Sequence, residues 1–566
     1  MKIMLYLFMM VVTAMAASPT VEIKVDQAGY LPKAPKTALV VAANPGQEFV
    51  VKRTSNGSVA FKGRLSAPIE DTDSGDRVLS ADFSKLTAPG QYYLEVPGVG
   101  RSWEFSVKPD VYSRAYYLAI RSFYGQRCGT AVDLGPEFPG YAYPACHSKG
   151  AWHPASGKSG TRISRKGWHD AGDYGRYIVN SGITTGTLLW TWELFGERIK
   201  NIRLNLPESG NGTPDILNEI RWNLEWMLTM QDEDGGVWHK QTSERFPGFI
   251  MPDKDTTLSY VIGTGQEPYK GTCATADFAA VMAIAARAYR PFDVSFSTQC
   301  LKAARQAWSW ASAHPGLFFR NPPGISTGGY GDRDCGDELL WAAGELWRTT
   351  GEEPFHRFFL DHYTEQRETL FSGYTEEWAH VGSLALSTYV LGRKGDREAM
   401  TAIRQDLLTA AGEIVERTSR NGYRVSLVAK DYEWGSNGLV ANYGMQLLIA
   451  NILKPDPKFY HAALDNLHYL LGRNTFSLCW VTRVGQNPVR HLHHRPSGAD
   501  SNSEPWPGLL SGGPNKNRQD EVTRKLPQLP PAKVYVDLEA SYASNENAIN
   551  WNAPLVFLLA GAMGPQ

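Results

Sequence analysis

The feature of this sequence that most constrains its fold is a change of hydrophobic period at residues 108–110. From about residue 21 to residue 107, apolar and polar residues alternate in short runs that turn-forming residues interrupt. After residue 110, apolar residues recur about every 3.6 positions, which is typical of helices, whereas alternation is typical of strands. We therefore expect a small all-β domain followed by a large all-α domain.

The alternating region predicts a β-sandwich of immunoglobulin type over residues 20–108, with roughly seven short strands. The clearest alternating runs are 22–26, 37–41, 49–53, 91–96 and 102–107. Breaks rich in Asn, Pro and Gly separate them, and these residues favour turns. No row of planar aromatic residues is evident there, so we expect this domain to support the next one rather than to bind a ligand itself.

Residues 111–566 are predicted to form one domain of about twelve helices. The apolar-periodic stretches lie near 111–126, 181–197, 213–231, 274–290, 297–313, 336–350, 354–363, 378–393, 396–417, 437–453, 456–472 and 545–562. They do not alternate with strands, which argues against a parallel α/β fold. An α/α toroid, an inner ring of helices inside an outer ring, fits this pattern, with the functional residues on long loops at one end.

Residues 1–16 have the layout of a secretory signal peptide. Lys2 precedes an apolar stretch over residues 3–12, and the small-x-small sequence Ala14-Met15-Ala16 follows. The stretch is too short to span a bilayer comfortably, and no later segment is long and uncharged enough to be a membrane span. We expect a soluble protein that is secreted or periplasmic.

The charge balance makes nucleic acid an unlikely partner. The chain carries 57 Lys and Arg against 58 Asp and Glu, a net charge of −1, so no general attraction to phosphate backbones or anionic lipid exists. It also contains 17 Trp, 26 Tyr and 22 Phe. These aromatic side chains could stack on a flat, weakly charged ligand, and they could equally well fill large hydrophobic cores.

Two acidic segments far apart in the sequence are candidates for chemistry. Asp170 and Asp173 lie among glycines in residues 167–174, and Glu546 stands just before an apolar helical stretch. A turn would explain the aspartates, and the helix dipole would explain the glutamate. Hydrolysis of a glycosidic bond, however, needs two carboxyl groups of different protonation, which two such segments could supply.

Three motifs resemble glycoside hydrolase family 9, the inverting cellulase family whose members fold as an (α/α)6 barrel. The first motif is filled by Tyr535, Asp537, Tyr542, Glu546, Ala548, Asn552 and Ala553. The second surrounds Val481, Thr482, Gly485, Asn487, Leu492, His493 and Arg495, with departures at Cys479, Arg483 and Val484 that concern sugar contacts. Residues 25–31 resemble the start of the immunoglobulin-like module of bacterial members.

The resemblance implies roles for individual residues. Glu546 would be the general acid, Asp173 the general base and Asp170 a second carboxylate that holds the attacking water. His493 and Arg495 would contact the sugar or orient the leaving side, and Asp537 would support the loop of the acid. Candidate stacking platforms, for which core packing is an equal alternative, are Trp434, Tyr432, Tyr330 and Trp341.

A second constellation has metal-ligand chemistry. Cys128, Cys146, His147 and His169 form the pattern C-x17-C-H-x21-H. Four such ligands suit a tetrahedral zinc site, and a Cys128–Cys146 disulfide beside two unrelated histidines is the alternative. The resemblance favours structural zinc, because related members with the N-terminal module carry zinc at the matching positions. The other cysteines are expected to be buried thiols: Cys273, Cys300, Cys335 and Cys479.

Calcium is also implied by the resemblance, with Asp277 and Asp253 or Asp255 as candidate ligands. An aspartate before a helix is otherwise a common cap.

The sequence therefore predicts a monomeric, inverting endo-β-1,4-glucanase that acts on cellulose or a related β-glucan. One alternative is an exo-acting β-glucosidase or exo-β-glucosaminidase on short oligosaccharides. A glycan-binding protein with an inactive site is the other, and the presence of all three acidic residues weighs against it.

Overall fold

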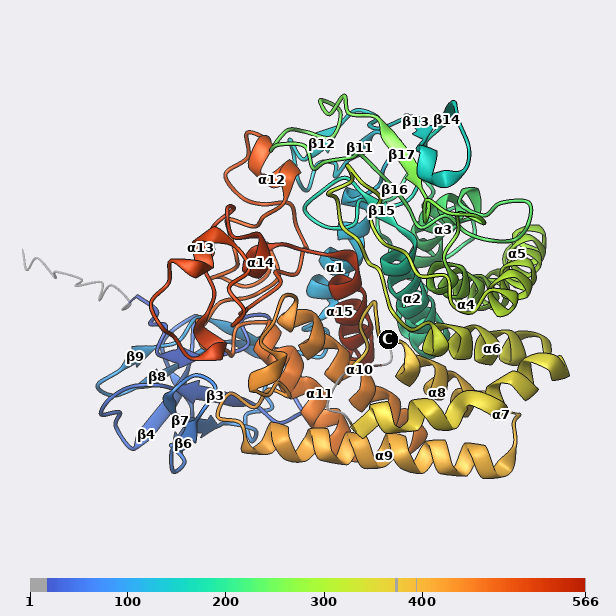
Figure 1. Ribbon diagram of the computed structural model, residues 1–566. Helices are drawn as coiled ribbons and strands as arrows, with labels where there is room; N and C mark the ends of the chain where they lie inside the picture. Colours follow the sequence, from blue (N-terminus) through green and yellow to red (C-terminus); the bar gives the residue numbers. More distant parts are fainter. Residues whose placement is uncertain (1–17, 372–374, 393, 565–566) are drawn as a thin grey trace, which may run out of the picture.

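The computed structural model describes residues 18–371, 375–392 and 394–564, so the predicted signal peptide lies outside the described residues (Figure 1). Residues 23–107 form two packed sheets, of strand order β1-β3-β7-β6 and β2-β10-β8-β4-β5, with β9 paired to β8. Their inward side chains, among them Val51, Leu94 and Phe105, form a separate apolar core. The strands are β1 (Ile23–Lys24), β2 (Gly29–Tyr30), β3 (Thr37–Val40), β4 (Glu48–Arg53), β5 (Val59–Arg64), β6 (Ile69–Asp71), β7 (Asp76–Asp82), β8 (Gly90–Val96), β9 (Gly100–Arg101) and β10 (Phe105–Val107).

In the described part of the chain, the second region is a barrel of twelve long helices, and each overlaps one of the predicted helical stretches. The inner helices pack in the sequence α10, α15, α2, α4, α6 and α8, and the others lie outside them (Figure 1). The predicted fold class, a β-sandwich followed by a helical barrel, is confirmed. The helices are α1 (Ser113–Gly125), α2 (Ile178–Ile199), α3 (Asp215–Thr229), α4 (Thr272–Tyr289), α5 (Val294–Ala313), α6 (Gly336–Thr350), α7 (Glu353–Arg367), α8 (Gly382–Leu391), α9 (Arg397–Arg420), α10 (Ser436–Leu453), α11 (Pro457–Leu470) and α15 (Ile549–Ala562).

The two rings differ in sequence for a physical reason. Inner helices such as α4 and α15 are buried almost all round, and their sequences are apolar on every face. Outer helices such as α9 bury one stripe and carry charged residues on the solvent side. A helix that is hydrophobic on every face must be enclosed by protein. An amphipathic helix can instead pack its apolar face against the inner ring and expose its polar face to solvent.

A small sheet, which no pattern in the sequence indicates, lies over the barrel beside the ends of α2 and α3 (Figure 1). Its strand order is β14-β13-β17-β16-β15. Strands of two to four residues are too short to show a period, and only pairing across the chain defines them. They are β13 (Lys149–Trp152), β14 (Thr161–Ile163), β15 (Arg176–Tyr177), β16 (Lys240–Thr242) and β17 (Ser259–Ile262).

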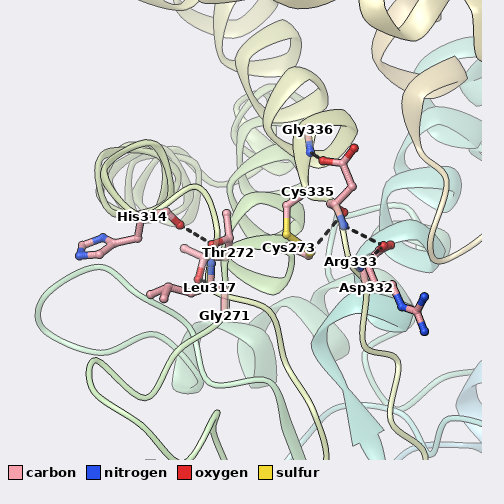
Figure 2. Close-up of a disulfide and its surroundings, with 11 residues drawn as sticks. Gly271, Thr272, Cys273, His314, Leu317, Asp332, Arg333, Cys335 and Gly336 are labelled. Carbon is pink, nitrogen blue, oxygen red and sulfur yellow. Dashed lines mark hydrogen bonds between the residues drawn. A yellow bond between two sulfur atoms is a disulfide. The ribbon is translucent and has the colours of Figure 1, made fainter.

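A disulfide joins Cys273, in the first turn of α4, to Cys335, directly before α6 (Figure 2). The expectation of free thiols at these two positions was wrong, whereas Cys300 and Cys479 are free and buried as predicted. The two cysteines are 62 positions apart, so only the packing of α4 against α6 brings them together. Closing a loop of that length stabilises the fold by about 4 kcal/mol in the chain-entropy account.

The sandwich contacts the barrel through buried polar groups. Asp26 Oδ2 lies 2.7 Å from His468 Nδ1 on α11. Gln27 donates to the carbonyl of Ser477 and accepts from the backbone N–H of Asn487 at 2.7 Å. These contacts fix the long segment after α11, which leads to the candidate site. No helix among the described residues has both the length and the apolar character needed to cross a bilayer.

Candidate active site and metal centre

The three predicted carboxylates line one cavity of about 720 Å³. Asp170 and Asp173 come from the segment between α1 and α2, and Glu546 comes from the segment before α15. Tyr330, Trp434, His493 and Arg495 line the same cavity. Folding therefore gathers the acidic residues of both sequence motifs around a space that is open to solvent.

Asp170 is held by donors on both carboxyl oxygens. Asn180 Nδ2 donates to Oδ1 at 2.7 Å, and the Tyr330 hydroxyl donates to Oδ2 at 2.5 Å. Burial, followed by the charge of Asp173, raises the pKa of Asp170, and the two hydrogen bonds oppose that rise. Asp170 is thus fixed in orientation at the cavity wall.

One carboxyl oxygen of Asp173 accepts hydrogen bonds from neighbouring residues of the same segment. Its Oδ2 accepts from the Gly175 N–H at 3.0 Å and from the Tyr177 hydroxyl at 3.1 Å. Among the described residues, no donor is found for Oδ1. That oxygen is the one available to a water molecule in the cavity.

Gly172, between the two aspartates, occupies a position where a side chain would not fit. A Cβ at this position would lie 2.1 Å from the carbonyl oxygen of His493. The backbone N–H of Gly172 donates to Glu546 Oε1 at 3.2 Å. The absence of a side chain therefore lets the two acidic segments approach each other.

Glu546 has an extended backbone between α14 (Tyr542–Asn545) and α15. It lies ahead of the helix rather than in its first turn, so the helix-dipole explanation does not apply. Desolvation, followed by the charge of Asp173, raises the pKa of Glu546 well above its ordinary value. A carboxyl group in this state keeps its proton near neutral pH, as a general acid must.

His493 and Arg495 lie between the two acidic segments. His493 Nδ1 lies 2.6 Å from the carbonyl oxygen of Glu539, and burial lowers the pKa of His493. Arg495 donates to the carbonyl oxygens of Gly172 at 2.8 Å and Pro247 at 2.9 Å. Both side chains are therefore oriented before any ligand binds.

Asp537 lies outside the cavity lining and fastens the acid's segment. Its carboxylate accepts from the backbone N–H groups of Arg490 and His491, each at 2.9 Å, and from Asn545 Nδ2 at 3.0 Å. Asn545 directly precedes Glu546. The contacts match a supporting position.

Two of the four candidate stacking platforms do not line the cavity. Tyr330 and Trp434 line the cavity, and Trp434 is 39% exposed. Tyr432 and Trp341 are buried in the barrel core, so the prediction that they are ligand platforms was wrong. Sequence alone does not separate the two pairs, because ring type and neighbours are similar.

The sequence candidates did not include three further aromatic residues at the cavity, Tyr177, Phe246 and Trp378. Trp378 also lines an adjoining pocket of about 240 Å³, together with Trp434 and Trp551. A usable signal existed, because Trp378 stands shortly before α8 as Trp434 stands shortly before α10. Phe246 lies in a loop without periodicity, and nothing in the sequence marked it.

Cys128, Cys146, His147 and His169 also come together. Their ligand atoms all lie within 4.8 Å of one another, and both cysteines are free thiols, so the disulfide alternative does not hold. Cys146 Sγ lies 3.7 Å from His169 Nε2. Two ligands of a tetrahedral zinc ion are about 3.6 Å apart.

The surroundings of this cluster also fit a metal ion. His147 Nε2 lies 3.0 Å from Asp255 Oδ2, while His147 Nδ1 is buried without a hydrogen-bond partner in the described part of the chain. A carboxylate on the outer nitrogen of a ligating histidine is the usual way its ring is oriented. The cluster directly adjoins the base segment, since His169 precedes Asp170.

Comparison with known proteins identifies the family. Residues 112–559 match the model described as Glycosyl hydrolase family 9, and residues 18–101 match the Cellulase N-terminal ig-like domain. The chain belongs to glycosyl hydrolase family 9. It is 38% identical over 547 residues to Endoglucanase D of Acetivibrio thermocellus, and the aligned region covers 95% of this chain and 83% of that protein.

Two other family members extend the comparison. A xyloglucan-specific endo-beta-1,4-glucanase of Bacteroides ovatus is 36% identical over 568 residues, covering 95% of this chain and 93% of that protein. The solved structure of a Zn-binding triple mutant of GH family 9 endoglucanase J30 matches with a TM-score of 0.87 and 33% identity, covering 95% and 100% of the two chains. This family 9 chain is therefore a glycoside hydrolase.

The candidate calcium ligands of this family 9 chain do not gather. Asp255 contacts His147, and Asp253 pairs with Lys254 at 2.7 Å. Asp277 is buried, and its carboxyl oxygens have no hydrogen-bond partner among the described residues. None of the three belongs to a group of three or more candidate ligands found in the part of the chain that the structure describes. Calcium stays a prediction.

Proposed function

We propose that this chain is an inverting endo-β-1,4-glucanase that hydrolyses cellulose or a related β-glucan. The observation that carries the proposal is the shared open cavity lined by Asp170, Asp173 and Glu546. The endoglucanase relatives, alike over almost the whole chain, support the substrate class.

In this mechanism, Glu546 donates its proton to the glycosidic oxygen as the bond to the leaving sugar breaks. Asp173 accepts a proton from a water molecule, which attacks the anomeric carbon from the opposite face of the ring. Asp170 orients that water. Inversion needs a separation of about 6.5–9.5 Å between acid and base, enough for the water to enter.

His493 and Arg495 bind the sugar beside the cleaved bond, and Tyr330 and Trp434 supply ring surfaces for its neighbours. Aromatic faces suit the apolar faces of pyranose rings, because both are flat and weakly charged. These groups would hold the sugar chain while the free oxygen of Asp173 accepts a proton from the attacking water.

The Cys/His cluster holds a structural zinc ion, bound by Cys128, Cys146, His147 and His169. A bound zinc ion would tie these four side chains together and so stabilise the loop that precedes Asp170. The protein is exported and acts as a monomer on its glucan substrate. The Cys273–Cys335 disulfide supports export, because such bonds persist in oxidising compartments.

The decisive experiment measures products from carboxymethylcellulose, mixed-linkage β-glucan, xyloglucan and cello-oligosaccharides. Endo action lowers polymer viscosity quickly relative to the release of reducing ends, and inversion gives the α-anomer as the first product by NMR. Release of monomer alone would favour the exo-acting alternative. A wild-type protein that binds glucan without hydrolysing it would support the binding-protein alternative.

A further inference from the structure

Lys240 is a buried cation directly behind the cavity wall. Its side chain is 0% exposed, and Nζ donates to Asn321 Oδ1 at 2.7 Å, Gly328 O at 2.7 Å, Thr327 Oγ1 at 3.1 Å and Thr327 O at 3.3 Å. All four acceptors are neutral oxygens. No ion pair of Lys240 is found among the described residues. An ammonium group, with three N–H donors, suits an all-oxygen cage better than a neutral amine.

Thr327 and Gly328, which accept hydrogen bonds from Lys240, lie at the start of the loop that carries Tyr330. Tyr330 has a left-handed backbone, with a φ of 46°, and its hydroxyl donates to Asp170. Such a conformation costs a non-glycine residue free energy and persists only where neighbours enforce it. His239, the residue before Lys240, contributes a second clamp, since its Nε2 lies 2.7 Å from the carbonyl oxygen of Gly329.

Lys240 is also electrostatically coupled to the proposed general base. Strand β16 pairs Lys240 with Tyr177, whose hydroxyl donates to Asp173. Burial lowers the pKa of Lys240 to about 7, and the nearby Asp173 opposes that decrease. The other titratable or charged groups that act on Asp173 or share its cavity are Asp170, Tyr177, Tyr330, His493, Arg495 and Glu546.

Arg495 and Lys240 interact electrostatically with different acidic residues. Arg495 acts on Glu546 and holds the carbonyl oxygen of Gly172. Lys240 interacts electrostatically with Asp173 and donates a hydrogen bond to the loop of Tyr330. Removal of Lys240 would take away its charge and its hydrogen bonds to the backbone of Thr327 and Gly328.

We propose that Lys240 is a positioning residue of the hydrolytic reaction: its ammonium group fixes the 327–330 loop, and through that loop it fixes the Tyr330 hydroxyl that orients Asp170. Lys240 does not line the cavity and does not touch the sugar. The inference rests on the proposed function.

The test compares Lys240→Met, Lys240→Gln and Lys240→Arg with wild type in pH profiles of kcat and KM on cellopentaose. In the two neutral variants, kcat falls at least 30-fold while KM changes less than threefold. Lys240→Arg keeps a hydrogen-bonding cation at this position and restores most of the lost kcat.

Lys36→Met is the matched control. Lys36 is also 0% exposed, and its Nζ donates to the backbone oxygens of Pro32 and Ala34 in the sandwich, far from the cavity. Its loss lowers thermal stability and leaves the pH profile unchanged. Lys240→Gln carries the test if Lys240→Met does not fold.

The outcomes separate the two claims. A wild-type chain that hydrolyses no β-glucan refutes the proposed function and this inference with it. If the wild type is active, the inference alone is refuted when the neutral Lys240 variants keep the wild-type kcat, or when Lys240→Arg loses as much kcat as they do. The inference also fails if their kcat loss is no larger than that of Lys36→Met.

Discussion

The two acidic segments of the cavity, 167–177 and 535–548, differ in the hydrogen bonds that their carboxyl groups receive. Asp173 receives two hydrogen bonds on one oxygen, and Asp170 receives one on each oxygen. Glu546 has one donor among the described residues, the Gly172 N–H at 3.2 Å. Hydrogen bonds to a carboxylate favour its ionised form, and desolvation favours the protonated form. Burial raises the pKa of both Asp170 and Glu546, but in Asp170 two hydrogen bonds from side chains oppose that rise.

The segments also differ in what fastens them. The Cys/His cluster adjoins the base segment, and Asp537 holds the acid segment through backbone N–H groups and Asn545. With the proposed zinc ion bound, one anchor would depend on a metal ion, whereas the other depends on hydrogen bonds. Each can therefore be disturbed separately.

The largest expected effect tests the assignment of acid and base directly. Glu546→Gln and Asp173→Asn each lower hydrolysis of β-glucan at least a thousandfold, because each removes one proton transfer. With dinitrophenyl cellobioside, whose leaving group needs no proton, Glu546→Gln recovers to within about tenfold of wild type and Asp173→Asn does not. Steady-state kinetics on both substrates make the measurement.

The control for this pair is Glu504→Gln, a carboxylate of the same region that pairs with Arg483 outside the cavity. It retains wild-type activity. Equal recovery of both variants on the activated substrate would contradict the comparison of the two segments.

The next effect concerns the anchor of the base segment. Wild type contains about one zinc per chain, and Cys146→Ser loses it because three ligands hold the ion weakly. Hydrolysis falls at least tenfold, since the loop before Asp170 is released. Metal analysis and kinetics are the measurements, with the buried free thiol variant Cys300→Ser as control. A mature protein with Cys128 oxidised to Cys146 would overturn the zinc assignment.

A smaller effect follows from the raised pKa of Glu546. The unfolded chain loses this proton near the ordinary value of 4.5, and the folded chain loses it at higher pH. Wild type is therefore destabilised relative to Glu546→Gln as pH rises above that value, and the two converge below it. We expect the variant to gain about 1–3 kcal/mol in free energy of unfolding between pH 4 and pH 7. Denaturant titrations at both values measure it, and a difference independent of pH would contradict it.

The smallest effect concerns one donor of the base segment. Tyr330→Phe removes the hydroxyl that donates to Asp170 and lowers kcat about tenfold, the equivalent of one hydrogen bond to a carboxylate. Tyr432→Phe is the matched control, because Tyr432 is buried outside the cavity. Equal kinetics of the two variants would show that the donor does not matter.

Particular elements show how far sequence patterns reach. All twelve helical stretches were predictable, because the inner helices are apolar on every face and the outer ones on one stripe. The pairing of β15 with β16 was not, since strands of two and three residues carry no period. Tyr432 and Trp434 are two positions apart, yet one is 2% and the other 39% exposed. Only the packing of the barrel decides which of them faces the cavity.

The chain alone determined which chemical groups are available: the acidic motifs, the Cys/His set and the change of period at residues 108–110. Tertiary structure decided their states. It paired Cys273 with Cys335, left Cys128 and Cys146 as thiols beside two histidines, and set Lys240 behind Asp173. Residue types and local period are written along the chain. Protonation, pairing and exposure depend instead on neighbours that only folding brings within a few ångströms.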